Sequence, residues 1–129
     1  MPITALAAAL LAPLYIYLTL QVISQRRGAK VAIGDGGDKT LLRRMRVQAN
    51  FAENVPFALI LMGLAESLRA SQLALYIIGG CLVVGRLSHA FGVSQPQETF
   101  AFRVSGMVLT FAAIVLAAIA CVAGALWRA

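Results

Sequence analysis

Apolar runs long enough to cross a lipid bilayer constrain this chain more than any other feature. Crossing the hydrocarbon core takes about 20 apolar residues in helical form, because lipid offers no hydrogen-bonding partner to unpaired backbone groups. The runs Ile3–Ile23 and Val104–Trp127 meet that length outright. A third run, Leu73–Gly85, extends to about Val93 with polar residues near its end. The sequence therefore predicts three membrane-spanning helices from these runs.

A further span between the first and the third run is harder to see, because its apolar core, Val55–Leu64, is short and follows a polar stretch. We still predict one long helix there, since Pro56 is its only helix breaker and proline is tolerated in membrane helices. At 1.5 Å per residue this helix would be about 45 Å long and would project beyond the lipid. The prediction is an all-α integral membrane four-helix bundle, a single domain over residues 1–129, with helices at about 3–24, 40–69, 73–93 and 102–127.

Composition agrees with a membrane protein and argues against nucleic-acid binding. Only 12% of the residues are charged, whereas a soluble domain averages about 25%, so most of the surface must face lipid. The net charge of +6 would otherwise suit a small nucleic-acid binder. Here the basic residues lie at the ends of apolar runs. Cys81 and Cys121 lie deep within such runs without metal-ligand spacing, so we expect neither a disulfide nor a metal site.

The Lys and Arg residues predict the orientation in the membrane. The expected connections are Gly28–Asp38, Ala70–Gln72 and Ser94–Phe100. The face that carries the first and third connections holds nine basic residues, Arg26, Arg27, Lys30, Lys39, Arg43, Arg44, Arg46, Arg86 and Arg103. The opposite face holds only Arg69 and Arg128. The positive-inside rule then places both connections in the cytoplasm and both termini outside.

Polar residues at membrane depth are energetically costly and usually have a function. At 100° per residue, one face of the 40–69 helix carries Arg43, Arg46, Asn50, Glu53, Asn54 and Phe57, with Gln48 nearly opposite. Arg86 and His89 share a face of the third helix, and Arg103 opens the fourth. Three helices are thus expected to bring cations to one membrane level around a single carboxylate, that of Glu53.

Such a pocket suits a small peptide that is mostly anionic. Guanidinium groups bind carboxylates in a bidentate fork, a carboxylate binds an ammonium group, and an asparagine side chain pairs with an amide. Glutathione offers two carboxylates, one ammonium group and two amides. An arginine beside its thiol would favour the thiolate and so activate the nucleophile.

The motifs that carry these residues resemble a known family. The stretch RVQANFAENVP at 46–56 resembles the R-x-Q/H-x-N-x-x-E-x-x-P signature of the MAPEG family, the membrane-associated proteins in eicosanoid and glutathione metabolism. VGRLSH at 84–89 resembles the third-helix motif of that family, and Arg103 is placed like its fourth-helix arginine. GDGGD at 34–38 is similar to the loop of bacterial members. The resemblance covers essentially the whole chain.

This resemblance implies a homotrimer of the inner membrane with a glutathione site between adjacent subunits at the cytoplasmic side. It implies a glutathione transferase that acts on a lipophilic electrophile entering from the bilayer. One subunit would hold glutathione with Arg46, Asn50, Glu53, Arg86 and His89, Arg103 would stabilise the thiolate, and the neighbour would supply Gln48 with Arg26 or Arg27. Two departures weaken the match: Val93 replaces a tyrosine of some members, and Ala49 replaces a further arginine.

Other interpretations stay open at this point. A small proton-coupled multidrug transporter could use Glu53, although the arginines around it would repel a cationic drug. A noncatalytic member of the family would keep the fold without turnover, and Val93 leaves room for that. Arg46 and Glu53 could form only an internal ion pair.

Two features outside the pocket have simple structural interpretations. Glu66 and Arg69, three residues apart, are expected to form a surface pair. Gly79, Gly80 and Gly85 are expected to allow close helix packing.

Overall fold

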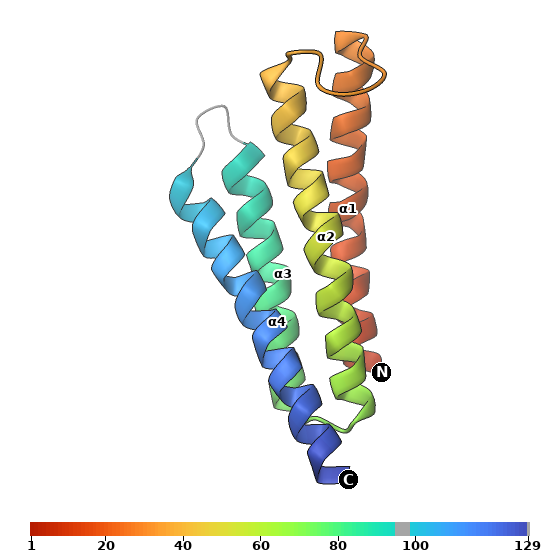
Figure 1. Cartoon of the computed structure of the whole chain (residues 1–129), viewed down its shortest axis with the longest axis vertical. Helices are drawn as coiled ribbons and strands as arrows, with labels where there is room; N and C mark the ends of the chain where they lie inside the picture. Colours follow the sequence, from red (N-terminus) through yellow and green to blue (C-terminus); the bar gives the residue numbers. More distant parts are fainter. Residues whose placement is uncertain (95–98, 129) are drawn as a thin grey trace.

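A computed structural model describes residues 1–94 and 99–128 of the chain, and it is an all-α four-helix bundle, as the sequence predicted. The helices are α1 (Pro2–Ala29), α2 (Lys39–Ser67), α3 (Gln72–Ser94) and α4 (Phe100–Arg128). The α1–α2 connection lies at one end of the bundle and both termini lie towards the other (Figure 1). The predicted connection between α3 and α4 falls partly on residues 95–98, outside the described residues.

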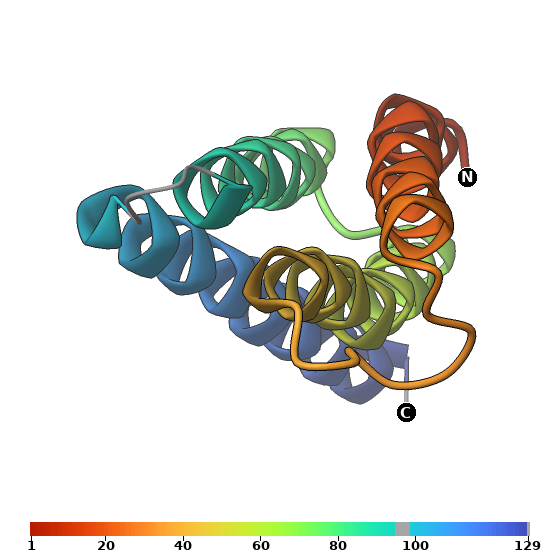
Figure 2. The same cartoon turned by 90° about the horizontal axis from the view of Figure 1, so that it is seen from above.

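Three of the four helices, α1, α3 and α4, are long and apolar enough to cross a membrane. Helix α2 does not meet that criterion in the part of the chain that the structure describes, because charged and polar residues interrupt its first half. Its 29 residues correspond to about 44 Å. It packs against each of the other three helices, and it lies between α1 and α4 when the bundle is seen from above (Figure 2). Helix α3 also packs against each of the other three, so α2 and α3 together form the centre of the bundle.

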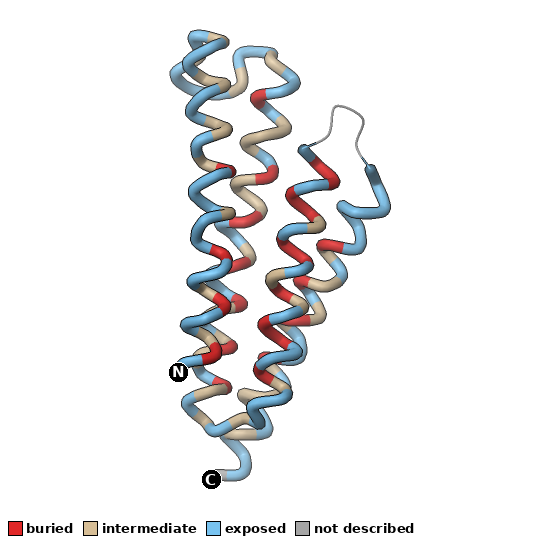
Figure 3. Tube along the Cα trace, turned by 180° about the vertical axis from the view of Figure 1, so that it is seen from behind, coloured by how far each residue is buried: buried red, intermediate tan, exposed pale blue. Residues whose placement is uncertain are grey.

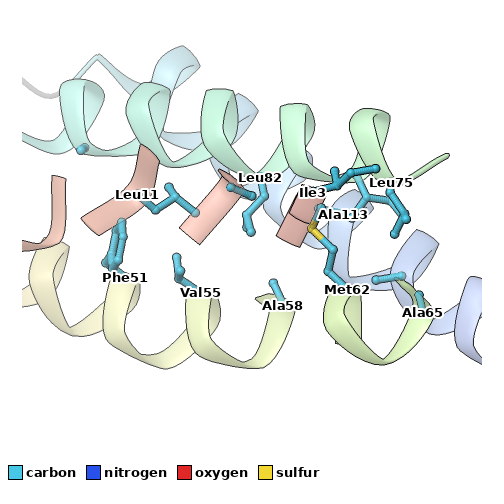
Figure 4. Packing of buried hydrophobic residues seen from close by; sticks show 14 of the residues in the cluster. Ile3, Leu11, Phe51, Val55, Ala58, Met62, Ala65, Leu75, Leu82 and Ala113 are labelled. Atoms are coloured by element: carbon cyan, nitrogen blue, oxygen red, sulfur yellow. The ribbon is translucent and has the colours of Figure 1, made fainter. Parts of the chain in front are cut away.

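The core follows the inward-facing sides of the helices. Figure 3 shows buried residues along these sides and exposed residues elsewhere. Leu11 of α1, Leu82 of α3 and the α2 residues Phe51, Val55 and Met62 point towards one another in Figure 4. Large apolar side chains also cover much of the outer surface, as expected for a protein whose outer faces contact lipid.

The ends of α1 and α2 differ from the predicted bounds because backbone turns and caps define them. Helix α1 continues to Ala29 and ends where Lys30 adopts a left-handed conformation with φ 54°. Asp38 caps α2, since its side chain accepts hydrogen bonds from the backbone N–H groups of Thr40 and Leu41. Gly36 and Gly37 between these helices have positive φ angles, which glycine adopts without strain.

Glycines bring α3 and α4 into close contact. A Cβ added to Gly85 would lie 2.9 Å from the carbonyl oxygen of Gly106, and one added to Gly106 would lie 2.5 Å from the backbone nitrogen of His89. The predicted packing role of Gly85 is thus confirmed. It is wrong for Gly80, because a Cβ there would meet nothing within 4 Å.

The predicted pair between Glu66 and Arg69 is wrong. The Glu66 carboxylate instead accepts hydrogen bonds from the backbone N–H groups of Ile3 (3.0 Å) and Thr4 (2.9 Å) and from the Thr4 hydroxyl (2.6 Å). Arg69 lies beyond the end of α2 with φ 63°, so the helical i, i+3 spacing does not apply to it. Glu66 therefore ties the end of α2 to the first turn of α1.

Candidate functional site

A cavity of about 530 Å³ lies between α2, α3 and α4 in the half of the bundle that carries the α1–α2 connection. Helix α2 contributes Lys39, Leu42, Arg43, Arg46, Val47, Ala49, Asn50 and Glu53, α3 contributes His89 and Val93, and α4 contributes Arg103. Ligand-binding cavities typically measure about 300–1,000 Å³. The volume is therefore sufficient for a small molecule.

Positive charge predominates in this cavity. Among the described lining residues, Lys39, Arg43, Arg46 and Arg103 are cationic and only Glu53 is acidic. Asn50 and His89 add neutral polar groups to the same wall. The arrangement can bind a ligand that carries more than one anionic group together with a single cationic group.

Helical spacing places the polar side chains of α2 on one side. Arg46, Asn50 and Glu53 stand at positions i, i+4 and i+7, which share a face. All three line the cavity. Within the part of the chain that the structure describes, no ion pair joins Arg46 to Glu53, so the internal ion pair considered from the sequence does not form.

Arg86 does not line this cavity with the other two arginines, which corrects the expected meeting of three guanidinium groups. Its side chain is 0% exposed. The Nη1 atom donates to Oδ1 of Asn50 at 2.8 Å, and Nη2 lies 3.2 Å from Nδ1 of His89. The guanidinium carbon also lies 5.5 Å from the centre of the Phe51 ring. Arg86 is thus buried inside the bundle, where Asn50 and His89 contact its two Nη atoms and the Phe51 ring lies beside it.

Buried polar atoms of Arg86 are not all satisfied. Its Nε atom has no hydrogen-bond partner among the described residues. Burying a charged group costs free energy unless it is paired, so such groups usually mark a functional site. The position of Arg86 therefore indicates that it acts in the site through its contacts with Asn50 and His89.

Arg103 reaches the cavity because the first turns of α4 pack against the last turns of α3. A Cβ added to Gly92 would lie 2.6 Å from the backbone nitrogen of Arg103, so a glycine permits this contact. The Arg103 side chain is exposed and lines the cavity opposite α2. It stands where it can meet a ligand held by Arg46 and Glu53.

Gln48, Arg26 and Arg27 lie outside the cavity. Arg26 donates from Nη1 to the carbonyl oxygens of Ala32 (3.2 Å) and Gly34 (2.9 Å), so it holds the α1–α2 connection of its own chain. Arg27 is exposed at the end of α1, and Gln48 is half-buried. Of the two arginines, Arg27 is the one whose side chain is presented to the surroundings.

Sequence reasoning missed Lys39 as a lining residue. Lys39, Arg43, Arg46, Asn50 and Glu53 are spaced by four, three, four and three residues, which is one continuous stripe along a helix. Extending the helical face of α2 back by one turn would have found it. The packing of Gly92 and Gly106 against α4 and α3 left no comparable signal, because neither has a second glycine four residues away that would mark a contact face.

Comparisons with known proteins match nearly the whole chain. Residues 4–123 match the MAPEG family. The chain is 35% identical over 118 residues to the inner membrane protein YecN of Escherichia coli K12, covering 92% of this chain and 88% of that protein. YecN of Escherichia coli O6:H1 strain CFT073 shows the same identity and coverage. All residues that line the cavity fall inside the region matched to the family.

Proposed function

The chain belongs to the MAPEG family, and from that premise we propose that it binds reduced glutathione in the cavity between α2, α3 and α4. The observation that carries the proposal is the set of charges along the cavity, four cations and one carboxylate among the described lining residues. Glutathione presents two carboxylates and one ammonium group. Its charges are therefore complementary to those of the cavity.

The proposed binding residues have roles that their chemistry supports. Arg46 binds a glutathione carboxylate, Glu53 binds the ammonium group, and Asn50 and His89 form hydrogen bonds to the remaining polar atoms. Arg86 acts from behind them, since it is buried against both. Arg103 stabilises the thiolate, because a guanidinium group beside a thiol favours the deprotonated form.

The bound thiolate is the nucleophile of a transferase reaction. The thiol proton passes to solvent, and the sulfur forms a bond to an electrophilic carbon of a lipophilic substrate. In a substitution, the leaving group departs with the electron pair of the bond that breaks. In an addition, a proton from solvent completes the product. Such a substrate would enter from the bilayer, because the outer surfaces of the helices are largely apolar.

A homotrimer in the inner membrane completes the proposed site. The relative YecN is an inner membrane protein, and three helices of this chain are long and apolar enough to cross a bilayer. The α1–α2 connection faces the cytoplasm, where glutathione is available, and both termini face outward. Gln48 lies outside the cavity of its own chain, and the neighbouring subunit supplies it together with Arg27 or Arg26.

Equilibrium dialysis of detergent-purified protein against labelled glutathione tests this proposal. We expect binding at millimolar glutathione or below. Arg46→Ala and Glu53→Gln should each weaken it by about tenfold, since one charge-assisted hydrogen bond contributes about 1.5 kcal/mol or more. Arg69→Ala, at the opposite end of the bundle, is the matched control and should bind like the wild type.

Assays of turnover and of drug uptake, added to the binding measurement, distinguish the alternative functions. Binding without product formation from lipophilic electrophiles would identify a noncatalytic member of the family. No binding at millimolar glutathione, combined with proton-coupled drug uptake in vesicles that Glu53→Gln abolishes, would overturn the proposal in favour of a transporter.

A further inference from the structure

The contact between Arg86 and His89 determines where the imidazole carries its proton. Nη2 of Arg86 lies 3.2 Å from Nδ1 of His89. A guanidinium group has only N–H donors and does not lose its proton in proteins. Nδ1 must therefore accept this hydrogen bond with its lone pair. The single proton of the ring then lies on Nε2, which makes Nε2 a donor.

Neighbouring side chains hold the arginine in the position that imposes this tautomer. Arg86 is 0% exposed, and its Nη1 atom is fixed by the 2.8 Å bond to Oδ1 of Asn50 on α2. The ring of Phe51 lies 5.5 Å from the guanidinium carbon. Because two helices and an aromatic ring restrain the guanidinium group, it cannot turn away from His89 without leaving buried donors unpaired.

The Nε2 side of the imidazole faces the cavity. His89 lines it together with Arg103. Nε2 has no hydrogen-bond partner within the described residues. The backbone of His89 is itself fixed, because Gly106 of α4 packs directly on its nitrogen. An N–H donor thus faces the same cavity as Arg103.

We propose that Arg86 is a positioning residue that keeps His89 in the Nε2–H form, and that this N–H donates a hydrogen bond to the sulfur of the glutathione thiolate. The inference rests on the proposed function and assigns a new role within its site. The donor from His89 and the guanidinium group of Arg103 act on the same sulfur. The cations nearer the start of α2, Lys39 and Arg46, are then available to bind the carboxylates of glutathione.

This arrangement also excludes a different role for His89. A histidine that acts as general base must accept the thiol proton on a nitrogen with a free lone pair. Nδ1 has its lone pair engaged by a cation, and Nε2 already holds a proton. The thiol proton therefore leaves to solvent, with one proton released for each thiolate formed, and His89 stabilises the product of that step.

The chain contains a single histidine, so its imidazole can be observed alone by NMR after labelling with ¹⁵N-histidine. In the free protein we expect a protonated Nε2 and an unprotonated Nδ1. Arg86→Lys, which keeps a donor, should preserve this pattern, and Arg86→Gln should yield a mixture of tautomers. A ring protonated on Nδ1 in the wild-type protein would overturn the positioning role whether or not glutathione binds.

Ligand titration then tests the contact to sulfur. Glutathione should shift the Nε2–H resonance, and the analogue with serine in place of cysteine should shift it much less. Equal shifts with both ligands would overturn the contact to sulfur. Failure of glutathione to bind at all would instead count against the proposed function, while the tautomer measured in the free protein would still stand.

Variants at His89 provide a functional readout. His89→Leu should reduce the fraction of thiolate formed by about tenfold, as expected for the loss of one hydrogen bond to a charged group. His89→Gln, whose amide N–H can approach the position of Nε2, should recover most of that loss. Thiolate formation in His89→Leu equal to that of the wild type would contradict the proposal.

Discussion

Arg86 on α3 donates a 2.8 Å hydrogen bond from Nη1 to Oδ1 of Asn50 on α2. This bond joins two helices directly behind the cavity that we assign to glutathione. No carboxylate accompanies Arg86 among the described residues. A neutral amide, an imidazole and an aromatic ring therefore take the place that a counter-ion usually occupies beside a buried cation.

Removal of the Asn50 amide should destabilise the bundle. We expect Asn50→Leu to lower the free energy of unfolding by about 1–3 kcal/mol, because it leaves a buried donor of Arg86 unpaired. Asn50→Asp restores an acceptor and should remain folded. The matched control is Asn54→Leu, since the Asn54 amide donates to a backbone carbonyl of its own helix, that of Asn50. Unfolding in mixed detergent micelles measures all three, and equal losses for Asn50→Leu and Asn54→Leu would contradict this account.

The contact between α3 and α4 should not tolerate a methyl group at Gly106. A Cβ there would lie 2.5 Å from the backbone nitrogen of His89, so Gly106→Ala must push the helices apart. We expect a loss of about 1–3 kcal/mol, as for overpacked cores, and weaker glutathione binding. Gly80→Ala, where nothing lies within 4 Å, should be neutral in thermal unfolding. Similar melting temperatures for the two variants would show that α3 and α4 are not in close contact.

Glu66 should stabilise the first turn of α1. Its carboxylate accepts the backbone N–H groups of Ile3 and Thr4, which have no partner within the helix. We expect Glu66→Ala to cost about 1 kcal/mol, the typical effect of losing an N-cap, and to speed hydrogen exchange in residues 3–6. Arg69→Ala should change neither quantity, because Arg69 does not pair with Glu66. An effect of Arg69→Ala as large as that of Glu66→Ala would instead indicate that Glu66 and Arg69 form the surface pair.

The start of α2 should weaken in acid because of Asp38. The side chain of Gln25 and the backbone N–H of Leu41 donate hydrogen bonds to the Asp38 carboxylate, which lowers its pKa from the usual value. The carboxylate therefore stabilises the folded form above its pKa in the unfolded chain, and this contribution is lost as the pH falls through the lowered folded value. Hydrogen exchange at the amides of Thr40 and Leu41 measures this loss.

Asp38→Asn supplies the matched control for that pH dependence. Asparagine is also a good N-cap residue but does not titrate. Exchange at Thr40 and Leu41 in the variant should not show the acid-dependent increase of the wild type. The same acid dependence in both proteins would assign it to another group.

Much of the fold could be predicted because the apolar runs alone require helices of bilayer length. The stripe from Arg46 to Glu53 could be predicted for the same kind of reason, since helical periodicity determines which residues of one helix share a face. Helix α2 was predicted despite its charges; it packs against the other three helices, and its polar face lines the cavity.

Contacts between helices could not be predicted from periodicity. Arg86 bonds to Asn50, 36 residues earlier in the chain, and Glu66 bonds to Thr4, 62 residues away. Which partner such a side chain meets depends on how far each helix slides and rotates against the next. For Arg86 the consequence was large, because the interhelical contact turned a predicted ligand-binding arginine into a buried one.

The central claim is that this cavity binds glutathione as its thiolate, and an ultraviolet difference spectrum tests it most directly. Detergent-purified protein is mixed with glutathione, and the absorbance of the thiolate is followed at a neutral pH where the free thiol is mostly protonated. We predict that the wild type develops the thiolate band at millimolar glutathione or below and that Arg103→Ala does not. No band in the wild type at millimolar glutathione, or an undiminished band in Arg103→Ala, would contradict the account.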